Sequence, residues 1–303
     1  MRLGETLRVE DGRLLGYATY GDPAGRPVFY FHGFPGSRLE AQLADPVAAR
    51  MGIRLIALDR PGFGLSDFKP RRTISEWPDD VVRLADALRI DRFATVGVSG
   101  GGPYAAACAL RIPQRLTTVS IVCGLAPLDT PGATHRMIRN NHWIFFLGRR
   151  LPWLAKISLR RIAYQVRRDP WAILRRHIAA LPDPDRAVFA RPEVKTTITD
   201  TVIEAFRGGS RGAVCELLLY TRPWGFLLGE IATRVSLWHG EQDVSVPPAM
   251  GQYQARTIPN CCATFYPGEG HFSLVINHME EILSGCLDDE TQKSDQPLLL
   301  QNG

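Results

Sequence analysis

Short apolar runs alternate with longer helical patterns through the first 123 residues of this chain of 303. Apolar runs of four to eight residues bounded by Gly, Pro or Asp are typical of strands. They predict strands at 13–20, 27–31, 53–58, 93–98 and 116–123. Spacing of apolar residues at three and four positions predicts helices at 37–51, 76–89 and 100–112. Regular alternation of strand and helix indicates a parallel sheet covered on both faces.

The alternation stops between residues 125 and 230, where the pattern predicts several helices rich in Arg and Trp and punctuated by prolines. It returns afterwards, with strands predicted at 234–239 and 263–266 and helices at 248–257 and 273–287. We therefore expect one discontinuous α/β domain, residues 1–124 and 231–287, interrupted by a helical insertion at 125–230. Residues 288–303 are expected to form a flexible tail.

Composition places the chain among ordinary globular proteins, with 45% hydrophobic and 22% charged residues. The most apolar stretch, 143–154, is interrupted by two arginines and a proline and is too short to span a bilayer. Residues 1–10 lack the pattern of a signal peptide. The six cysteines form no CxxC pair, which favours reduced thiols over a zinc site or a disulfide framework. These features predict a cytoplasmic protein without integral membrane association.

The net charge of +5 is distributed unevenly. Residues 125–230 hold 17 Lys or Arg against 9 Asp or Glu, whereas the rest of the chain holds 19 against 22. Such asymmetry can indicate nucleic acid, an anionic membrane surface or acidic substrates. Because the arginines are interspersed with Trp, Leu and Ile, we favour a solvated helical face and predict no nucleic-acid partner. Contact with an acidic partner or surface stays open.

Ser99 is the candidate nucleophile. It lies in Gly97-Val98-Ser99-Gly100-Gly101, a match to G-x-S-x-G between a predicted strand and a predicted helix. A serine hydroxyl is a weak nucleophile and has to be exposed on a tight turn beside a general base, with small neighbours that avoid clashes. A structural turn serine would also fit the five residues alone, but the strand–turn–helix context favours nucleophilic catalysis.

His271 is the candidate general base. It follows the last predicted strand in the Gly-rich segment 268–272, where little backbone bulk would block its approach to Ser99. His239 ends a strand, and a structural hydrogen-bonding role is expected for it. The histidines that lie in helical patterns are expected at the surface or in packing: His135, His142, His177 and His278.

Asp243 is the candidate acid of the triad. It follows the predicted strand 234–239, where a loop can point a carboxylate into the site to orient the imidazole of His271 and stabilise its charged form. Asp129, beyond the strand that ends at Cys123, is the alternative acid.

Acyl transfer also requires donors for the developing oxyanion. The backbone N–H of Gly100, directly after Ser99, is the first candidate. The segment 32–37, His-Gly-Phe-Pro-Gly-Ser, follows an earlier strand and offers the N–H of Phe34 as the second. A plain Gly-Pro turn would account for the glycines of this loop but not for its position.

Taken together, these residues resemble the α/β-hydrolase superfamily. The resemblance runs from about residue 13 to 285, through segments 32–35 and 59–66, the Ser99 motif, Asp243 and His271. It implies an α/β-hydrolase fold with a mostly parallel eight-stranded sheet, a helical cap inserted after the sixth strand, and catalysis with no metal and no cofactor. Segment 59–66 shapes a loop in the family and is given no catalytic role. Epoxide hydrolases and haloalkane dehalogenases share the loop but use Asp as nucleophile, so Ser99 disfavours both.

The predicted activity is that of a serine carboxylesterase acting on a small-molecule ester with a small or medium apolar acyl or aromatic group. A lactonase, including one for acyl-homoserine lactones, and a C–C bond hydrolase would use the same triad and stay open. Two further alternatives are a non-catalytic ligand receptor and a dinucleotide-binding protein, the latter because residues 100–105 fit G-x-G-x-x-A. A monomer or homodimer is expected.

Seven aromatic residues between 125 and 230 suggest an apolar underside of the cap, although they could equally hold its helices together. They are Trp143, Phe145, Phe146, Trp153, Trp171, Trp224 and Phe226.

Overall fold

The computed structural model describes residues 2–287 and contains an eight-stranded sheet in the order β1-β2-β4-β3-β5-β6-β7-β8. Strands β3 to β8 run parallel to one another, while β2 is antiparallel to both β1 and β4. This is the mostly parallel sheet of the α/β-hydrolase fold that the sequence predicts. The strands are β1 (Arg2–Arg8), β2 (Leu14–Gly21), β3 (Arg26–Phe31), β4 (Ile53–Leu58), β5 (Phe93–Val98), β6 (Leu116–Val122), β7 (Val235–Gly240) and β8 (Cys261–Tyr266).

Strand burial explains which strands the sequence reveals. Every residue of the central strand β5 is buried, so that it reads as a continuous apolar run. Edge strand β1 is mostly exposed and carries charges at Arg2, Glu5 and Arg8. Its residue pattern therefore predicts no strand, and only the resemblance to the family supplied the eighth one.

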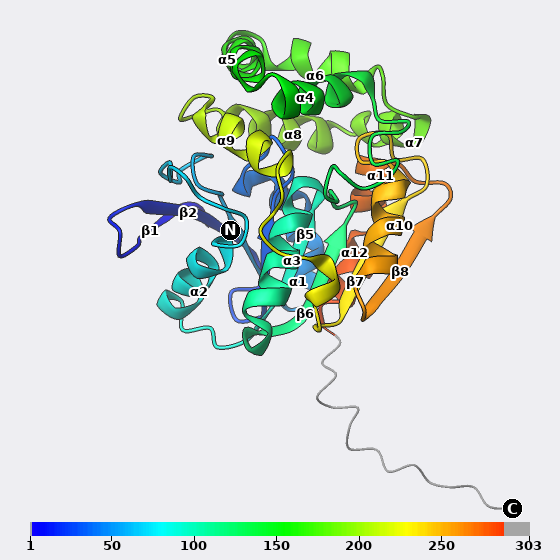
Figure 1. Ribbon diagram of the computed structural model, residues 1–303. Coiled ribbons are helices and arrows are strands. Elements are labelled where there is room, and N and C mark those ends of the chain that lie inside the picture. The colour runs from blue at the N-terminus through cyan, green and yellow to red at the C-terminus, as the bar shows by residue number, and fades with distance from the viewer. Residues whose placement is uncertain (1, 288–303) are drawn as a thin grey trace, which may run out of the picture.

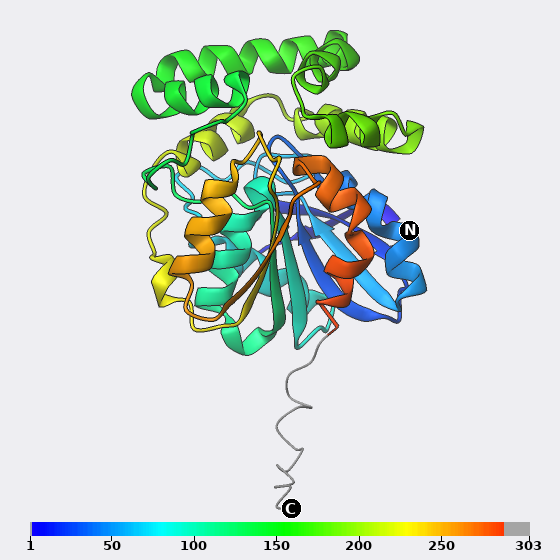
Figure 2. The ribbon, with the colours of Figure 1, turned by 90° about the vertical axis from the view of Figure 1, so that its right-hand side faces the viewer.

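Helices cover both faces of the sheet (Figures 1 and 2). One face packs against α2 (Trp77–Ala87), α3 (Gly102–Arg111) and α10 (Pro248–Thr257). The other packs against the 3-10 helix Arg38–Ala44, α1 (Asp45–Arg50), α11 (His271–Asn277) and α12 (Met279–Ser284). Two apolar clusters, one on each face, form the core of this layered arrangement.

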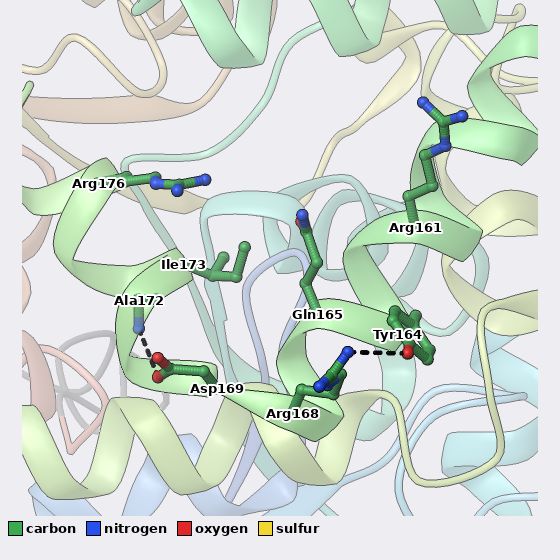
Figure 3. Close-up of a pocket in the computed structure, with 8 residues that line it drawn as sticks. All are labelled: Arg161, Tyr164, Gln165, Arg168, Asp169, Ala172, Ile173 and Arg176. Atoms are coloured by element: carbon green, nitrogen blue, oxygen red, sulfur yellow. Dashed lines mark hydrogen bonds between the residues drawn. The ribbon is translucent and has the colours of Figure 1, made fainter.

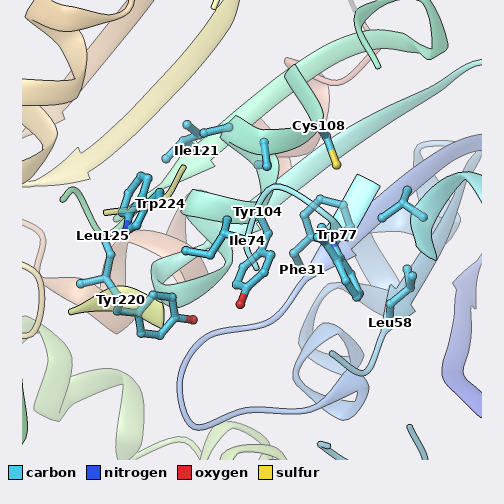
Figure 4. Close-up of a cluster of buried hydrophobic side chains, with 14 of the residues drawn as sticks. Phe31, Leu58, Ile74, Trp77, Tyr104, Cys108, Ile121, Leu125, Tyr220 and Trp224 are labelled. Atoms are coloured by element: carbon cyan, nitrogen blue, oxygen red, sulfur yellow. The ribbon is translucent and has the colours of Figure 1, made fainter. Parts of the chain in front are cut away.

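Six α-helices lie between β6 and β7 and cover the edge of the sheet at the carboxyl ends of the parallel strands (Figures 1 and 2). We call them the inserted helices: α4 (Arg139–Arg150), α5 (Pro152–Arg168), α6 (Pro170–Ile178), α7 (Asp183–Phe189), α8 (Pro192–Ala205) and α9 (Arg211–Tyr220). Tyr220 and Trp224, at the end of this segment, join the core cluster that contains Phe31, Trp77 and Tyr104 (Figure 4). The inserted segment is thus anchored in the core of the sheet.

Two predicted helices are each divided in two. The predicted helix 37–51 is a 3-10 helix followed by α1, since Pro46 has no N–H to continue the hydrogen bonding of the preceding turn. The predicted helix 273–287 is α11 and α12, and α11 begins at His271 rather than at Ser273. His271 therefore lies in the first turn of a helix and not in a loop.

The predicted tail at 288–303 lies outside the described residues. Among residues 2–287, no helix is both long enough and apolar enough to cross a membrane.

Candidate active site

Ser99 follows β5 directly and has a φ of 54°, in the left-handed region that non-glycine residues seldom adopt. Its glycine neighbours make this sharp turn possible. A Cβ on Gly97 would lie 2.5 Å from the carbonyl oxygen of Gly101, and one on Gly101 would lie 2.1 Å from that of Phe31. The Ser99 turn is therefore compressed against the strand before it and against a neighbouring strand, as a strand-to-helix nucleophile turn requires.

The glycine run also accounts for the match to a dinucleotide motif. A Cβ on Gly100 would lie 2.6 Å from the hydroxyl of Tyr220, and one on Gly102 would lie 2.8 Å from the Cα of Gly124. Close packing within the protein thus explains these glycines without a nucleotide phosphate beside them.

Asp243 and His271 are joined by a buried hydrogen bond of 2.7 Å between Nδ1 of the imidazole and Oδ2 of the carboxylate. The other carboxylate oxygen accepts the backbone N–H groups of Ser245 and Val246, both at 2.8 Å. The loop after β7 therefore holds the carboxylate rigidly. Because Nδ1 is engaged with Asp243, Nε2 is the nitrogen of His271 that is left for proton transfer.

The electrostatics at His271 favour its charged form. Burial by itself would lower its pKa, but the negative charge and hydrogen bond of Asp243 outweigh burial and raise the pKa above the ordinary 6.5. Asp185 and Glu40 act in the same direction. A charged imidazole at His271 is thus stabilised by the carboxylates of Asp243, Asp185 and Glu40.

Asp129, the alternative acid, is exposed in a turn, and the structure gives it no contact with His271. His239 is buried, with Nε2 2.9 Å from the carbonyl oxygen of Val246 and 3.6 Å from Asp243 Oδ2. Burial lowers the pKa of His239 in spite of that neighbouring carboxylate. Of the two sequence-predicted acids, only Asp243 is hydrogen-bonded to His271.

Asp185 is a site residue that the sequence does not reveal. It is fully buried on α7, and its carboxylate accepts the backbone N–H groups of His271, Phe272 and Ser273 at 2.8–3.0 Å. These are free donors at the start of α11, so Asp185 caps this helix from a distant part of the chain. A Cβ on Gly270 would lie 2.6 Å from the Asp185 carboxylate, which explains the glycine before His271.

The loop after β3 contains Phe34, whose backbone N–H is the predicted second donor. Among residues 2–287, the backbone N–H of Phe34 has no hydrogen-bond partner, whereas that of Gly33 donates to Glu40 at 3.0 Å. A Cβ on Gly33 would lie 3.5 Å from the Cβ of Ser99, and one on Gly100 would lie 2.8 Å from the Cβ of Phe34. The loop after β3 and the turn at Ser99 are therefore in contact, and the backbone N–H of Phe34 is free.

A buried ionic network supports this loop from below. The guanidinium of Arg60 donates to the carbonyl oxygens of His32 and Gly33 and forms an ion pair of 2.5 Å with Glu216 on α9. Arg72 pairs with the other oxygen of Glu216. Burial would raise the pKa of Glu216, but the two arginines lower it to about 2. The network therefore ties the loop of Phe34 to an inserted helix.

Tyr220 connects the same network to the Ser99 turn. Its hydroxyl lies 2.7 Å from the carbonyl oxygen of Gly100 and 2.7 Å from a carboxylate oxygen of Glu216. A hydroxyl has one proton, so it donates to one of these acceptors at a time. Helix α9 thus contacts the site through both Glu216 and Tyr220.

Cys123, Asp243 and His271 are the one group of potential metal ligands found among the described residues, with their ligand atoms within 4.8 Å of one another. Burial and the nearby Asp243 carboxylate raise the pKa of the Cys123 thiol well above its ordinary value. Metal ligation requires the thiolate, so this donor set fits a metal poorly. We interpret Cys123 as a thiol beside the Asp243 carboxylate.

Beside His271, the inserted helices contribute His177. Its ring centroid lies 6.2 Å from that of Phe272, whose ring lies 5.2 Å from His271. Burial and the positive charge of His271 lower the pKa of His177 to about 4, so it is neutral at pH 7. The expectation of a surface or packing role overlooked this closeness to His271, because helical spacing does not show what lies across an interface.

The predicted aromatic underside requires a correction. Trp143, Phe146 and Trp153 are exposed to solvent, with Trp153 63% accessible. Phe145 and Trp224 are buried in the core cluster. The Nζ atom of Lys195 lies over the Trp171 ring, 3.7 Å from its centroid. The aromatic residues in contact with His271 and its neighbour are instead Phe272 and Phe189, whose rings lie 4.8 Å apart.

Comparison with known proteins agrees with the fold. Residues 26–277 match the model of the alpha/beta hydrolase fold family, and the chain belongs to this family. A thermophilic esterase from Thermogutta terrifontis superposes with a TM-score of 0.67 and 25% identity, covering 95% of this chain and 98% of that one.

Two curated relatives match only in part. The dihydrolipoyllysine-residue acetyltransferase component of the acetoin cleaving system of Pseudomonas putida is 35% identical over 112 residues, 37% of this chain and 30% of that protein. The 2-hydroxymuconate semialdehyde hydrolase of Pseudomonas sp. (strain CF600) is 36% identical over 115 residues, 36% of this chain and 39% of that protein. The match thus spans less than half of the length of each relative.

Proposed function

We propose that this protein is a serine hydrolase that cleaves carboxylic esters, with Ser99 as nucleophile, His271 as general base and Asp243 as the acid that orients it. The observation that carries the proposal is the 2.7 Å hydrogen bond between Asp243 and His271. It is supported by the strained backbone of Ser99 at the end of β5. A residue held in this conformation is costly and is often found at functional sites.

In the proposed reaction, Oγ of Ser99 attacks the ester carbonyl carbon while Nε2 of His271 takes the hydroxyl proton. The carbonyl oxygen becomes an oxyanion and accepts the N–H groups of Phe34 and Gly100. Collapse of the intermediate breaks the bond to the alcohol, which leaves with the proton from His271. Water then attacks the acyl-enzyme with the same base, and the acid is released with Ser99 regenerated.

We propose that the inserted helices form a cap that limits which acyl groups reach Ser99. Their contacts with the site support this, since Asp185 binds the start of α11 and Glu216 pairs with Arg60. The apolar rings of Phe34 and Phe272 favour a small or medium acyl or aromatic group. This surface replaces the aromatic set expected from the sequence.

The test is turnover of p-nitrophenyl esters by the protein and by Ser99→Ala. We expect Ser99→Ala to lose at least about a thousandfold in kcat with little change in Tm, because Ser99 is only half buried. Retained turnover would refute the nucleophile, and absence of turnover in the unmodified protein would favour a ligand receptor.

Lactones and C–C bonds can be cleaved by the same groups, so the reacting bond is tested separately. A panel of esters of graded acyl length, lactones including acyl-homoserine lactones, and a vinylogous diketone is compared by kcat/KM. The proposal predicts the highest kcat/KM for an ester. If kcat/KM for a lactone or the diketone exceeded that for every ester by more than about tenfold, the proposed triad would stand but the proposed substrate class would be wrong.

A further inference from the structure

The outermost inserted helices expose large apolar side chains to solvent. Six of the exposed large hydrophobic residues in the described chain lie on α4, on α5 or between them: Trp143, Phe146, Leu151, Trp153, Ile157 and Tyr164. Trp153 and Tyr164 are 63% and 60% accessible. Single exposed apolar residues are normal on a protein surface, but a set of aromatic and aliphatic residues on one helical hairpin indicates a contact surface.

Helix α5 is apolar on two opposite sides. Its inner side buries four residues in the protein, namely Ala155, Leu159, Ala163 and Val166. Trp153, Ile157 and Tyr164 recur at intervals of four and seven residues, which places them together on the opposite side. The inner side accounts for the folding of the helix. Among residues 2–287 the outer side stays largely exposed to solvent, although it carries a tryptophan and a tyrosine.

Positive charge surrounds this outer side. From residue 130 to residue 168 the chain has nine Lys or Arg and no Asp or Glu. Arg160 and Arg161 lie between Ile157 and Tyr164, and Arg168 donates to the Tyr164 hydroxyl at 3.2 Å. None of the Lys or Arg residues of α4 and α5 forms an ion pair within the described chain. Their charge is therefore not neutralised by the protein itself.

A shallow groove of about 330 Å³ between α5 and α6 continues the basic surface. Its lining includes Arg161, Tyr164, Arg168 and Arg176, which Figure 3 shows around one opening. Asp169 also lines it, and its carboxylate accepts the backbone N–H of Ala172 as a helix cap. The groove thus adds a further arginine, Arg176, beside the exposed side of α5.

We propose that the outer side of α5, with the groove beside it, docks on an anionic phospholipid bilayer. A helix that presents Trp, Tyr and Ile among arginines suits the bilayer interface, where apolar side chains enter the acyl boundary and cations bind lipid phosphates. In Figures 1 and 2, α5 lies on the side of the inserted helices that faces away from the sheet. The inference goes beyond ester hydrolysis and does not depend on it.

Other occupants of this surface fit less well. A second copy docked through the same face would bring the arginines of the groove, Arg161, Arg168 and Arg176, against the same positive charges of its partner. A nucleic acid would bind the arginines and stack on aromatic rings, but the aliphatic side chains of Leu151 and Ile157 offer it nothing to stack on. A bilayer uses the aliphatic, aromatic and cationic side chains together.

Co-sedimentation with vesicles tests the proposal. The full chain should sediment with mixed phosphatidylcholine and phosphatidylglycerol vesicles at low ionic strength, and far less with phosphatidylcholine alone or at high salt. The double variant Arg160→Glu and Arg161→Glu should lower the partition coefficient at least about tenfold. Trp153→Ala should lower it severalfold by removing the apolar anchor.

Matched controls separate this surface from general effects of charge and exposure. Arg111→Glu with Arg256→Glu makes the same charge change at two exposed arginines of α3 and α10, and Leu227→Ala removes a side chain that is 68% exposed. All variants should keep the circular dichroism spectrum and the ester turnover of the parent protein. The controls should bind the mixed vesicles as the parent does.

Three results would overturn the proposal. The first is equal sedimentation of the α5 variants and the parent protein. The second is binding of a single-stranded oligonucleotide, lost in the α5 variants, without binding to anionic vesicles. The third is a dimer in analytical ultracentrifugation that Trp153→Ala dissociates, because that result would assign the surface to a second copy of the chain.

Discussion

Asp185, on inserted helix α7, accepts the backbone N–H of His271 at 3.0 Å. The candidate catalytic base therefore begins a helix whose free N–H groups are bonded by a residue 86 positions earlier in the chain. Any movement of α7 relative to the sheet would break these bonds. The position of the imidazole thus depends on the docking of the inserted helices.

Asp185→Ala should reduce kcat/KM about tenfold. Loss of a helix cap costs about 1 kcal/mol of stability, and a small displacement of the base lowers the rate of proton transfer. It should also shift the acid limb of the pH profile downward, because the Asp185 charge helps to raise the pKa of His271. Asp183→Ala, at an exposed carboxylate of the same helix, is the control and should change neither. A fall in Tm with an unshifted pH profile would reduce Asp185 to a structural role.

The pH dependence should report His271 directly. Hydrolysis needs the neutral imidazole, so kcat/KM should rise with pH through a pKa above 6.5. Asp243→Asn removes the charge that raises this pKa, so the limb should move to lower pH as kcat falls. Asp129→Asn should leave both unchanged. If the acid limb moved in Asp129→Asn and not in Asp243→Asn, Asp129 rather than Asp243 would be the acid that interacts with His271.

The same raised pKa has a consequence for stability. The folded state binds the proton of His271 more strongly than the unfolded state does. The resulting contribution to the free energy of unfolding is therefore complete below pH 6.5 and is lost as pH rises through the folded-state pKa. Chemical unfolding at a series of pH values should show that this decline is smaller in Asp243→Asn. If the free energy of unfolding declined equally in both proteins, titratable groups other than His271 would cause the decline.

Glu216 should carry a large part of the stability at the interface of α9 with the core. Glu216→Gln leaves Arg60 and Arg72 buried without their counter-ion, which should cost about 3–5 kcal/mol in the free energy of unfolding. Because its pKa is lowered to about 2, the contribution of Glu216 is present above pH 4.5 and declines as pH falls toward 2. Glu193→Gln, at an exposed residue of α8, should cost almost nothing.

Gly100→Ala should impair catalysis by crowding the Ser99 turn. The added Cβ would lie 2.6 Å from the Tyr220 hydroxyl and 2.8 Å from the Cβ of Phe34, so one of them has to move. We expect at least about a tenfold loss in kcat, as when an oxyanion donor is displaced. Gly208→Ala, where a Cβ meets no atom within 4 Å, should retain full kcat. Equal activity of the two variants would contradict the assigned position of Gly100.

The central parallel strands could be predicted because they are short, mostly apolar and largely buried, as β3, β4 and β5 are. The Ser99 motif could be predicted because a tight turn demands glycines. Edge strand β1 could not be predicted from its residues, because its exposed positions carry charged side chains. Asp243 was predictable from its place after a strand. Asp185 was not, because nothing in its local sequence marks a carboxylate that caps a helix 86 residues later.

The aromatic residues of α4 and α5 show the opposite failure. Trp143 and Trp153 look like core or pocket residues by composition, yet both are exposed, at 54% and 63%. Residue type predicts burial only on average, and the direction of a side chain depends on how its helix packs. Glu216 was not predicted either, although it is the lone acid of an apolar helix, a pattern that indicates a buried partner of opposite charge.

If Ser99 forms a covalent acyl-enzyme, a fluorophosphonate should react with the same hydroxyl. The full chain is treated with the probe, digested, and mapped by mass spectrometry, with Ser99→Ala and the heat-unfolded protein as controls. We expect one adduct, on Ser99, that is absent from both controls. An adduct on another residue, or no adduct on a protein that still hydrolyses esters, would contradict it.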